Sequence, residues 1–266
     1  MRKLLLALMF LSILPGAAYA VVFGQLDNNA HPHVGTLLFK TASGWYSCTG
    51  TLLAPRLVLT AGHCTEEAGL PNEKTFVTFA PAVTQWPPVV NGVPVAGNGW
   101  IEGQAIPHPQ YNDYAEFPRT YDAGLVELFE DATVTQFAAL PNEGFLKTIA
   151  TSRNQKDNRF TVVGYGMQGV LRPFYSDNWA RYQGTVRLIE ISSNLNAGQS
   201  AKFTSNPGLG GGTCYGDSGG PIFFGNSNIV VAVVSWGITP CIGNSYEFRV
   251  DTQVALDFIA QHMPVP

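Results

Sequence analysis

Charged side chains are scarce in this sequence, at 13% of 266 residues, and the formal net charge is −4. No basic stripe occurs anywhere along the chain, which argues against nucleic acid as a partner. Glycine and proline are instead abundant, with 28 and 18 residues. Because little charge with much glycine and proline suits tight turns, the composition favours many short strands over long helices.

Long apolar runs are missing after the first twenty residues. Arg2 and Lys3 precede the apolar run Leu4–Leu14, and positions 18–20 read AYA, a small-x-small cleavage pattern. This arrangement predicts an export signal over residues 1–20, cleaved near Ala20. The run is too short to span a bilayer, which disfavours the alternative of a retained anchor. The mature protein is therefore predicted to be secreted or periplasmic, without membrane association.

Cysteine is also rare, with four residues: Cys48, Cys64, Cys214 and Cys241. In an exported chain they suggest two disulfides, for which three pairings are possible. No C-x-x-C spacing occurs, so a zinc site is disfavoured, and no metal or other cofactor is predicted. The HPH sequence at 31–33 has a proline between its histidines and is expected to form a solvated loop.

Short apolar runs of strand length follow one another along the mature chain. Gly, Pro, Asn and Asp cluster between them, the pattern of an all-β sandwich or barrel. Residues 80–100, rich in Pro, Gly and Val, are expected to form an elaborated loop. The predicted strands are 34–39, 51–53, 57–60, 75–79, 124–129, 160–163, 185–191, 221–224 and 229–236.

A helix is expected only near the C-terminus. Asp251 or Thr252 can cap it, and Val254, Ala255, Phe258 and Ile259 then fall on one face. Two barrels with this helix across them fit the pattern. The predicted organisation is a signal peptide over 1–20, an N-terminal barrel over 21–135, and a C-terminal barrel with its helix over 136–266.

The segment 213–221 reads TCYGDSGGP and carries the strongest chemical signal. Its glycines allow positive φ and outward N–H groups, as a nest for an oxyanion requires. Ser218 within it can attack a carbonyl if a base removes its proton. The same letters fit the G-x-S-x-G pattern of α/β-hydrolases, but that fold needs a following acid and histidine. Only His262 follows Ser218, so a lipase or esterase is disfavoured.

A base and an acid can be proposed from two upstream segments. His63 lies in TAGHC at 60–64, and a serine needs such an imidazole to accept its proton. Asp122 directly precedes an alternating apolar strand in TYDAGLVEL at 120–128, where a carboxylate can be buried and held rigid. Asp113 is the competing acid and is predicted to be a surface turn residue.

These segments, in this order, together with SWG at 235–237, resemble the chymotrypsin-like (trypsin-type) serine protease family. IPHPQYN at 106–112 and GYG at 164–166 are weaker matches, the latter with Tyr165 where the family usually has Trp. The resemblance covers essentially the whole mature chain. It implies two packed antiparallel Greek-key β-barrels forming one peptidase domain that acts on polypeptides without a cofactor, and we expect a monomer.

The resemblance also implies a role for each motif residue. Ser218 would be the nucleophile, His63 the general base and then acid, and Asp122 the orienting carboxylate. The N–H groups of Gly216 and Ser218 would form the oxyanion hole. The remaining implied assignments are a substrate-pairing edge at Ser235, Trp236 and Gly237, and the disulfides Cys48–Cys64 and Cys214–Cys241.

The start of the mature chain, VVFG at 21–24, resembles the Ile-Val-Gly-Gly start of the activated family members, although Phe23 replaces a glycine. In that family the new N-terminal amine pairs with the aspartate before the nucleophile. We therefore hypothesise that signal removal itself activates the enzyme, with the Val21 amine paired to Asp217.

Substrate specificity is indicated by the position six residues before the nucleophile, where an acid selects Arg or Lys in this family. That position is Gly212, followed by Thr213, and Gly237 leaves the pocket entrance open. A buried Arg head would lack a carboxylate there. An apolar or aromatic P1 residue is therefore expected, unless Glu247 reaches the pocket and restores basic specificity. A non-catalytic, protease-like binding module is the alternative, disfavoured because all three triad residues are present.

Overall fold

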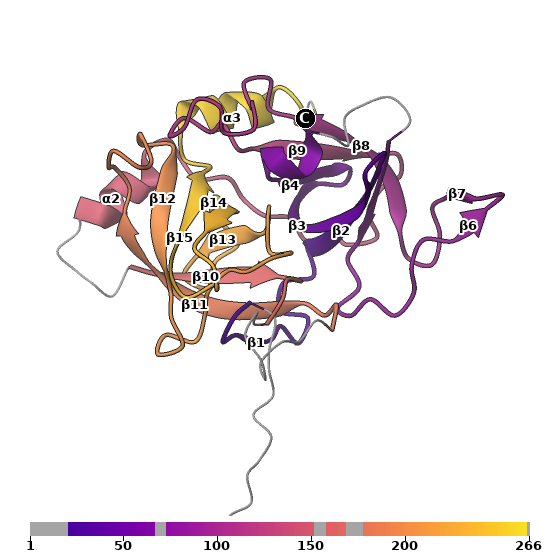
Figure 1. Ribbon diagram of the computed structural model, residues 1–266, viewed down its shortest axis with the longest axis horizontal. Helices are drawn as coiled ribbons and strands as arrows, with labels where there is room; N and C mark the ends of the chain where they lie inside the picture. Colours follow the sequence, from indigo (N-terminus) through magenta and orange to yellow (C-terminus); the bar gives the residue numbers. More distant parts are fainter. Residues whose placement is uncertain (1–20, 67–72, 152–157, 169–177, 265–266) are drawn as a thin grey trace, which may run out of the picture.

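The computed structural model describes residues 21–66, 73–151, 158–168 and 178–264, and the predicted signal segment lies outside them. Within these ranges, every helix is too short or too polar to cross a membrane. Two barrels lie side by side, with helix α3 across the top of the view in Figure 1.

The first barrel is a closed ring of six antiparallel strands in the order β2-β3-β4-β9-β8-β5. A small hairpin of β6 (Val89–Val90) and β7 (Val93–Pro94) projects from its outer side (Figure 1). This hairpin belongs to the loop predicted over 80–100. The six strands are β2 (Val34–Thr41), β3 (Gly44–Ala54), β4 (Leu57–Thr60), β5 (Lys74–Thr78), β8 (Ile101–Pro107) and β9 (Gly124–Leu128).

The second barrel closes through a β11–β12 pairing into the ring β10-β11-β12-β15-β14-β13. Relative to chain order, both rings have the same sequence of neighbours, so the two barrels share one Greek-key topology. Strand β1 (Gln25–Leu26) adds to the outside of β11. The fold predicted from sequence is thereby confirmed. The six strands are β10 (Arg159–Gly164), β11 (Tyr182–Glu190), β12 (Ser200–Ser205), β13 (Pro221–Phe224), β14 (Val230–Gly237) and β15 (Gly243–Arg249).

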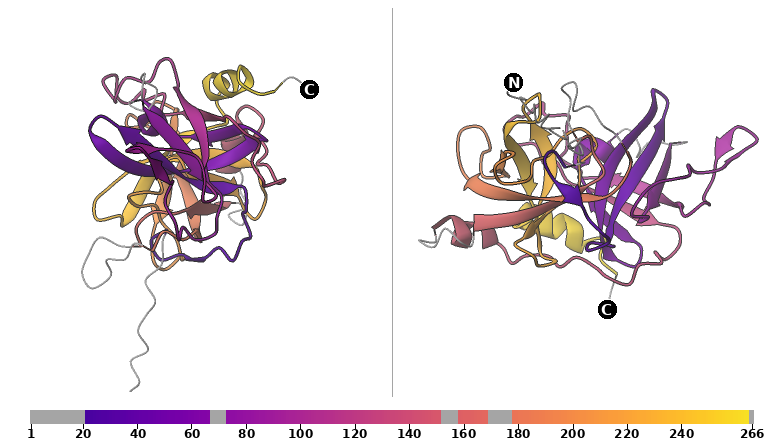
Figure 2. Two further views of the ribbon diagram at one scale, coloured as in Figure 1. Left: turned by 90° about the vertical axis from the view of Figure 1, so that its right-hand side faces the viewer. Right: turned by 90° about the horizontal axis from the view of Figure 1, so that it is seen from below.

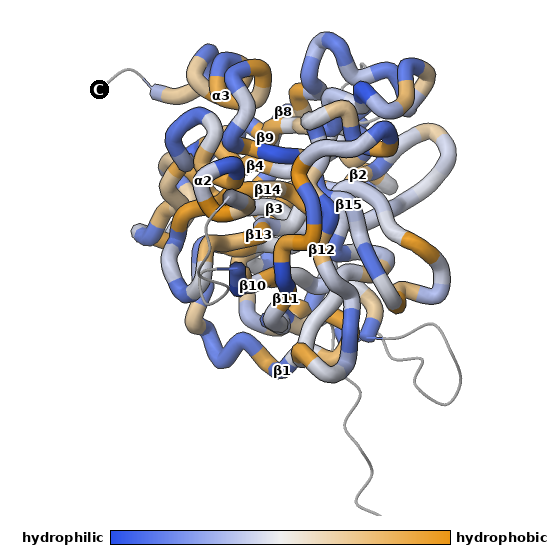
Figure 3. Tube along the Cα trace, turned by 90° about the vertical axis from the view of Figure 1, so that its left-hand side faces the viewer, coloured by the Kyte–Doolittle hydropathy of each residue, from blue (hydrophilic) through white to orange (hydrophobic). Residues whose placement is uncertain are grey.

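Apolar side chains form one core inside each barrel and a third core between the barrels. The third core joins Leu59 and Leu125 of the first barrel to Phe223 and Phe248 of the second. Figure 3 shows orange stretches in the middle of the molecule around β13 and β14, whereas blue stretches occur both in loops and along strands such as β12. Burial of this shared core holds the two barrels together, so a site between them has rigid walls.

Helix α3 (Gln253–Ala260) packs on the shared core through Ala255, Phe258 and Ile259. Thr252 caps it, because its hydroxyl accepts from the Ala255 N–H at 3.4 Å. Asp251 does not share this role. Its carboxylate accepts instead from the Leu146 N–H at 2.7 Å.

Two helices lie where the sequence predicted none. One is α1 (Gly62–Thr65), a single turn after β4, and the other is α2 (Phe145–Thr151). The first turn of α2 is fixed by the Asp251 carboxylate, which comes from 105 residues further along the chain. Figure 2 shows α2 on the far side of the second barrel, away from the first.

The prediction of a solvated loop at 31–33 is wrong. His33 is only 4% exposed, and the His31 ring stacks on Phe223 with centroids 5.4 Å apart. His31 Nδ1 contacts Asp27 Oδ1 at 2.5 Å, and Asp27 also pairs with the buried Arg181 at 2.9 Å. The segment packs against Phe223 of the second barrel, and the Asp27 carboxylate satisfies the His31 ring nitrogen, whereas the His33 ring nitrogens have no hydrogen-bond partner among the described residues.

Candidate active site

The His63 and Asp122 side chains come from the first barrel, at the ends of two paired strands. β4 pairs with β9 so that Thr60 lies opposite Gly124, which places the residues just beyond these ends next to each other. Gly124 permits the close approach, since a Cβ there would lie 2.4 Å from Thr65 Oγ1. The strand register thus fixes the His63–Asp122 geometry.

Two of the three predicted triad residues are hydrogen-bonded. The His63 N–H donates to Asp122 Oδ1 at 2.8 Å, and His63 Nδ1 lies 3.1 and 3.0 Å from the two carboxylate oxygens. Asp122 is fully buried. Burial acts to raise the pKa of Asp122, but the His63 charge and the hydrogen bonds outweigh it and hold this pKa below its ordinary value.

The same pairing controls the imidazole. Burial acts to lower the pKa of His63, but the neighbouring Asp122 carboxylate outweighs it and holds the pKa above 6.5. With Nδ1 engaged by Asp122, the other ring nitrogen is the one placed to exchange a proton with a substrate group or a serine. The pair has the geometry of a base held in one tautomer.

Two further hydroxyl groups hold Asp122, and sequence reasoning assigned neither of them to it. Ser235 Oγ donates to Asp122 Oδ2 at 2.5 Å, which links the second barrel to the first. Tyr114 OH donates to the same oxygen at 3.0 Å. Tyr114 lies in the loop before β9 with a φ of +61°, a conformation that no sequence motif indicates.

The serine loop is built around the buried carboxylate of Asp217. Asp217 accepts from the N–H groups of Gly166 and Cys214, both at 2.9 Å. Gly219 follows Ser218 with a φ of +76°, and a Cβ there would lie 2.0 Å from Thr60 Oγ1. The glycine lets the loop lie against the first barrel, which brings Ser218 to the junction.

The two predicted oxyanion-hole residues, Gly216 and Ser218, are held through their carbonyl groups. Thr49 Oγ1 donates to the Gly216 carbonyl at 2.9 Å, and the Thr49 N–H donates to the Ser218 carbonyl at 2.8 Å. Among the described residues, no hydrogen bond uses the N–H of Gly216 or Ser218 as donor. These two N–H groups are therefore available for an oxygen with developing negative charge.

Ser218 and His63 line the same pocket, together with Gly216 and Tyr46. In the part of the chain that the structure describes, no hydrogen bond joins the Ser218 hydroxyl to the imidazole. Such contacts between nucleophile and base often tighten only when substrate binds. The structure thus brings the third predicted residue to the site from the second barrel.

A second pocket, of about 260 Å³, adjoins Ser218 and contains most of the predicted specificity residues. Thr213 and Gly237 line it, but Gly212 does not. Gly212 is covered by Ser205, since a Cβ at Gly212 would lie 2.0 Å from Ser205 Oγ. The full lining is Ser205, Thr213, Cys214, Tyr215, Ser218, Val234, Ser235, Trp236, Gly237, Ile238, Thr239, Cys241, Asn244 and Ser245.

Glu247 lies directly behind the wall of this pocket. It is fully buried, accepting from Thr213 Oγ1 at 3.3 Å and from the Ser235 N–H at 2.9 Å. Burial raises the pKa of Glu247 to about 7. The carboxylate is therefore close to a proton equilibrium at neutral pH and lies one hydrogen bond away from the pocket surface.

Ser235, Trp236 and Gly237 form the end of β14, beside the same pocket. The Trp236 ring stacks on Tyr246, with centroids 3.9 Å apart and an interplanar angle of 4°. Phe117 forms a T-shaped pair with the indole, with centroids 5.7 Å apart. These contacts fix the indole as one wall at the pocket mouth.

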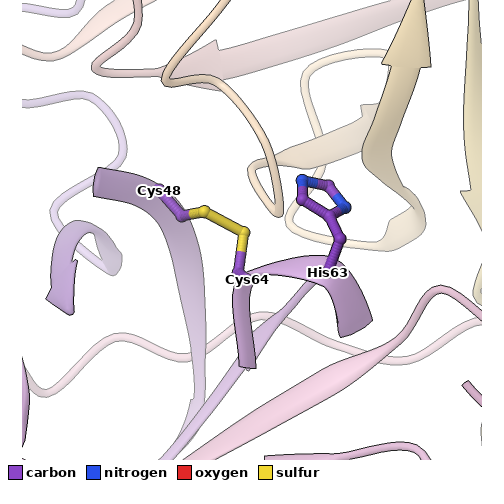
Figure 4. A group of neighbouring side chains, drawn as sticks. All are labelled: Cys48, His63 and Cys64. Atoms are coloured by element: carbon purple, nitrogen blue, oxygen red, sulfur yellow. A yellow bond between two sulfur atoms is a disulfide. The ribbon is translucent and has the colours of Figure 1, made fainter. Parts of the chain in front are cut away.

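Both disulfides flank the site. Cys48–Cys64 joins β3 to α1, next to His63, and Cys214–Cys241 closes the loop before Ser218. Sγ atoms of Cys48 and Cys64 also lie within 4.8 Å of the His63 ring, a spacing that suits a metal ion. Figure 4 shows that the two sulfurs are bonded to each other, so this group offers no thiolate ligands.

Val21 and Val22 are buried, and Val22 packs on the Cys214–Cys241 disulfide. Cys214 in turn donates its N–H to Asp217. Burial raises the pKa of Asp217 to about 7, and the Gly166 and Cys214 N–H groups offset it only in part. The hydrogen bonds of the described residues do not include one between Val21 and Asp217.

The structure has two barrels of the same topology, with a buried His–Asp pair on one and a serine in a glycine-rich loop on the other. Together these features define the class of chymotrypsin-like serine proteases. A protein-family model described as Trypsin matches residues 22–259. The chain therefore belongs to the trypsin family of serine endopeptidases.

Known relatives agree with this assignment, and a solved structure agrees with the fold. The chain is 25% identical over 231 residues to a trypsin from Saccharopolyspora erythraea, covering 81% of this chain and 86% of that one. It is 26% identical over 236 residues to the CLIP domain-containing serine protease B15 of Anopheles gambiae, spanning 63% of that longer protein. A structure of HL collagenase matches with a TM-score of 0.70 at 18% identity, covering 92% of this chain and all of that one.

Proposed function

We propose that this protein is a secreted endopeptidase that cleaves peptide bonds through Ser218, His63 and Asp122. The observation that carries the proposal is the hydrogen-bonded His63–Asp122 pair, whose histidine lines one pocket with Ser218 across the barrel junction. Ser218 Oγ attacks the scissile carbonyl carbon while His63 takes the hydroxyl proton. The oxyanion that forms is stabilised by the N–H groups of Gly216 and Ser218.

The remaining steps follow from the same groups. His63 returns the proton to the amine that leaves, and an acyl group remains on Ser218 Oγ. Water then enters and attacks the acyl carbon while it gives a proton to His63. His63 passes this proton to Ser218 Oγ as the bond between that oxygen and the acyl carbon breaks, which frees the acid product and restores the serine hydroxyl. Asp122 keeps its charge throughout and stabilises the imidazolium that exists between these proton transfers.

An apolar or aromatic P1 side chain is proposed for the pocket beside Ser218. Val234, Trp236 and Ile238 supply apolar surface, and none of the described residues that line this pocket is charged. An extended substrate would pair its backbone along Ser235–Gly237. A basic P1 residue is the second candidate, because the Glu247 carboxylate contacts Thr213 on the pocket wall.

Export and activation are proposed to be one event at the Ala20–Val21 bond. Val21 has a φ of +51°, which is strained for a β-branched residue while a peptide bond precedes it. Cleavage removes this constraint and creates an amine on the buried Val21, and its proposed partner is the buried Asp217, which has no cationic partner among the described residues. Substrates are polypeptides, and the active form is proposed to be a monomer without a metal or cofactor.

A serine-directed fluorophosphonate tests the central proposal on the secreted protein. We expect one adduct, located on Ser218 by peptide mass analysis, and parallel loss of peptidase activity. The Ser218→Ala variant should take up no label while keeping the wild-type unfolding temperature. A folded wild-type protein that neither labels nor cleaves peptides would instead be a protease-like binding module.

A further inference from the structure

Four of the five tryptophans gather on one outer corner of the first barrel, away from the P1 pocket. Three of them line a mainly apolar groove of about 480 Å³, which we call the tryptophan groove. Trp45 and Trp86 are 45% and 49% exposed, although water contact with an indole is unfavourable. The groove is lined by Leu38, Trp45, Tyr46, Ser47, Trp86, Pro87, Val89 and Trp179.

The walls of the tryptophan groove are fixed before any ligand binds. The 80–100 loop is tied to the segment before β11, because the Val83 N–H donates to the Trp179 carbonyl and the Arg181 N–H to the Pro81 carbonyl, both at 2.8 Å. Within the loop, Trp100 Nε1 donates to the Gln85 carbonyl at 2.8 Å. The groove therefore needs little ordering when a ligand enters.

The indole rings support one another. Trp86 stacks on Trp100 with an interplanar angle of 11°, and it forms a T-shaped pair with Trp179 at 77° with centroids 4.7 Å apart. Trp100 is buried behind the groove, so the exposed Trp86 ring is held in place from two sides. Lys40 Nζ lies 6.0 Å from the Trp45 ring, and the residues that line the groove carry no charge.

The tryptophan groove continues directly into the catalytic pocket. Tyr46, Ser47 and Trp179 line both the groove and the pocket that contains His63 and Ser218. The P1 pocket shares Ser218 with the catalytic pocket but none of these three residues. The acyl side of the substrate is proposed to pair along Ser235–Gly237, which line the P1 pocket and not the groove. With the acyl side placed there, the chain that follows the scissile bond is the part left to extend toward the tryptophan groove.

We propose that the tryptophan groove binds the leaving-group side of a polypeptide substrate and selects a bulky apolar or aromatic side chain there. This inference rests on the proposed peptidase function and names a substrate feature that the P1 pocket does not determine. The occupant is a peptide because the groove joins the site where a peptide bond is cut. It is apolar because the lining offers indole, aliphatic and proline surface without a charged group.

A series of internally quenched peptides tests the proposal. All share one acyl side, and each carries Gly, Leu, Phe, Trp, Lys or Asp at one of the four positions after the scissile bond. Wild-type protein should show kcat/KM about tenfold higher for a bulky apolar residue than for Gly at one of these positions. Rates are expressed per active site, titrated with the fluorophosphonate, so a misfolded fraction does not enter the ratio.

Three variants locate the preference. Trp86→Ala and, separately, Trp45→Ala should reduce the apolar-to-Gly ratio to within about twofold of unity. Val90→Ala is the matched control, because Val90 lies in the same 80–100 loop as Trp86 and is 53% exposed, but does not line the groove. It should keep the full preference.

Each remaining outcome overturns the proposal. A flat profile in wild-type protein, a preference for Lys or Asp, or a preference kept by both tryptophan variants would exclude this role for the groove. A dimer in sedimentation that Trp86→Ala dissociates without changing the profile would mean that a second copy covers the groove. Labelling of Ser218 with a flat profile rejects only the groove, whereas absence of both labelling and cleavage rejects the peptidase function itself.

Discussion

The hydroxyl of Tyr114 donates to Asp122 Oδ2 at 3.0 Å, on the oxygen that Ser235 Oγ reaches at 2.5 Å. Asp122 Oδ1 accepts from the His63 N–H, so donors occupy both oxygens of a carboxylate with no exposed surface. Each donor withdraws part of the negative charge that the imidazole would otherwise experience. Tyr114 is therefore a positioning residue that acts on His63 through Asp122.

Replacing Tyr114 with Phe should shift the pH dependence of the enzyme. The His63 pKa lies above 6.5 because of Asp122, and kcat/KM should fall as His63 becomes protonated below that pKa. With one donor fewer, Asp122 attracts the proton on His63 more strongly, so the midpoint of the low-pH limb should rise by roughly half a unit. The measurement is a profile of kcat/KM from pH 5 to 9 on a chromogenic peptide.

Tyr111→Phe is the matched control, because the Tyr111 ring contacts the Tyr114 ring at 6.0 Å but its buried hydroxyl has no hydrogen-bond partner among the described residues. Its midpoint should stay at the wild-type value. A purely structural role for Tyr114 would lower the active fraction while leaving the midpoint in place, and that result would contradict the proposed coupling to His63.

The fold class could be predicted from the sequence because most strands are apolar runs and because each sequence motif forms a local turn of its own. It did not indicate β8, β12 or β15, each of which carries polar residues. β12 reads SAKFTS and β15 reads GNSYEFR, and both are buried mainly because they close a barrel. Tertiary packing determines whether such segments form strands, as it does for any segment in which apolar and polar residues alternate only weakly.

The features missed at the site depend on contacts across long stretches of sequence. Tyr114 contacts Ser235, which lies 121 residues further along the chain. In the first turn of α2, the Leu146 N–H donates to the Asp251 carboxylate, 105 residues further along. Glu247 is similar, because only the register of β15 on β14 places it behind Thr213. His63 and Ser218 each lie in a local motif, because the residues next to them in sequence form the turn that positions them. Tyr114, Glu247 and helix α2 have no such local signature.

The P1 preference can be tested at Glu247. Wild-type protein should cleave after Phe or Leu faster than after Arg, and Glu247→Gln should change the Arg-to-Phe ratio of kcat/KM by less than about threefold. Glutamine keeps an acceptor for the Ser235 N–H but cannot ionise. If Glu247 instead selects basic residues, the ratio should exceed one in wild-type protein and fall about a hundredfold in the variant. That fall would be larger at pH 8 than at pH 6, because the Glu247 pKa of about 7 leaves more carboxylate ionised.

The state of Asp217 should distinguish the processed from the unprocessed chain. Before cleavage, burial raises the pKa of Asp217 to about 7. A free Val21 amine beside it would favour the ionised carboxylate and order the loop that carries Ser218. An ion pair of about 3 kcal/mol changes populations roughly a hundredfold, so a chain with two extra residues before Val21 should be about that much less active than one starting at Val21.

N-terminal sequencing of the active secreted protein provides the direct check, with Val21 expected as the first residue. Asp217→Asn in a chain starting at Val21 should lower activity to the level of the extended chain, because asparagine cannot pair with the amine. Equal activity of the extended and processed chains would show that the Val21 amine has no part in activation.

Stability below pH 6.5 should depend on His33. Burial and the charges of His31 and Arg181 lower the His33 pKa to about 4, an effect that Asp27 offsets only in part. Neither ring nitrogen has a hydrogen-bond partner among the described residues. Between pH 6.5 and 4 the unfolded chain binds a proton at His33 that the folded protein does not. The free energy of unfolding should therefore decrease by roughly 3 kcal/mol as the pH falls over this interval.

Urea unfolding of wild-type protein and His33→Leu at pH 7.5 and at pH 4.5 measures this contribution. The two proteins share every other titrating group, so the change in their stability difference isolates His33. From pH 7.5 to pH 4.5, the free energy of unfolding of the variant should increase relative to that of wild-type protein by roughly 2 kcal/mol or more, because leucine at this site does not bind a proton. A stability difference that is the same at both pH values would mean that His33 becomes protonated while it remains in place against Phe223, with its charge accommodated by Asp27.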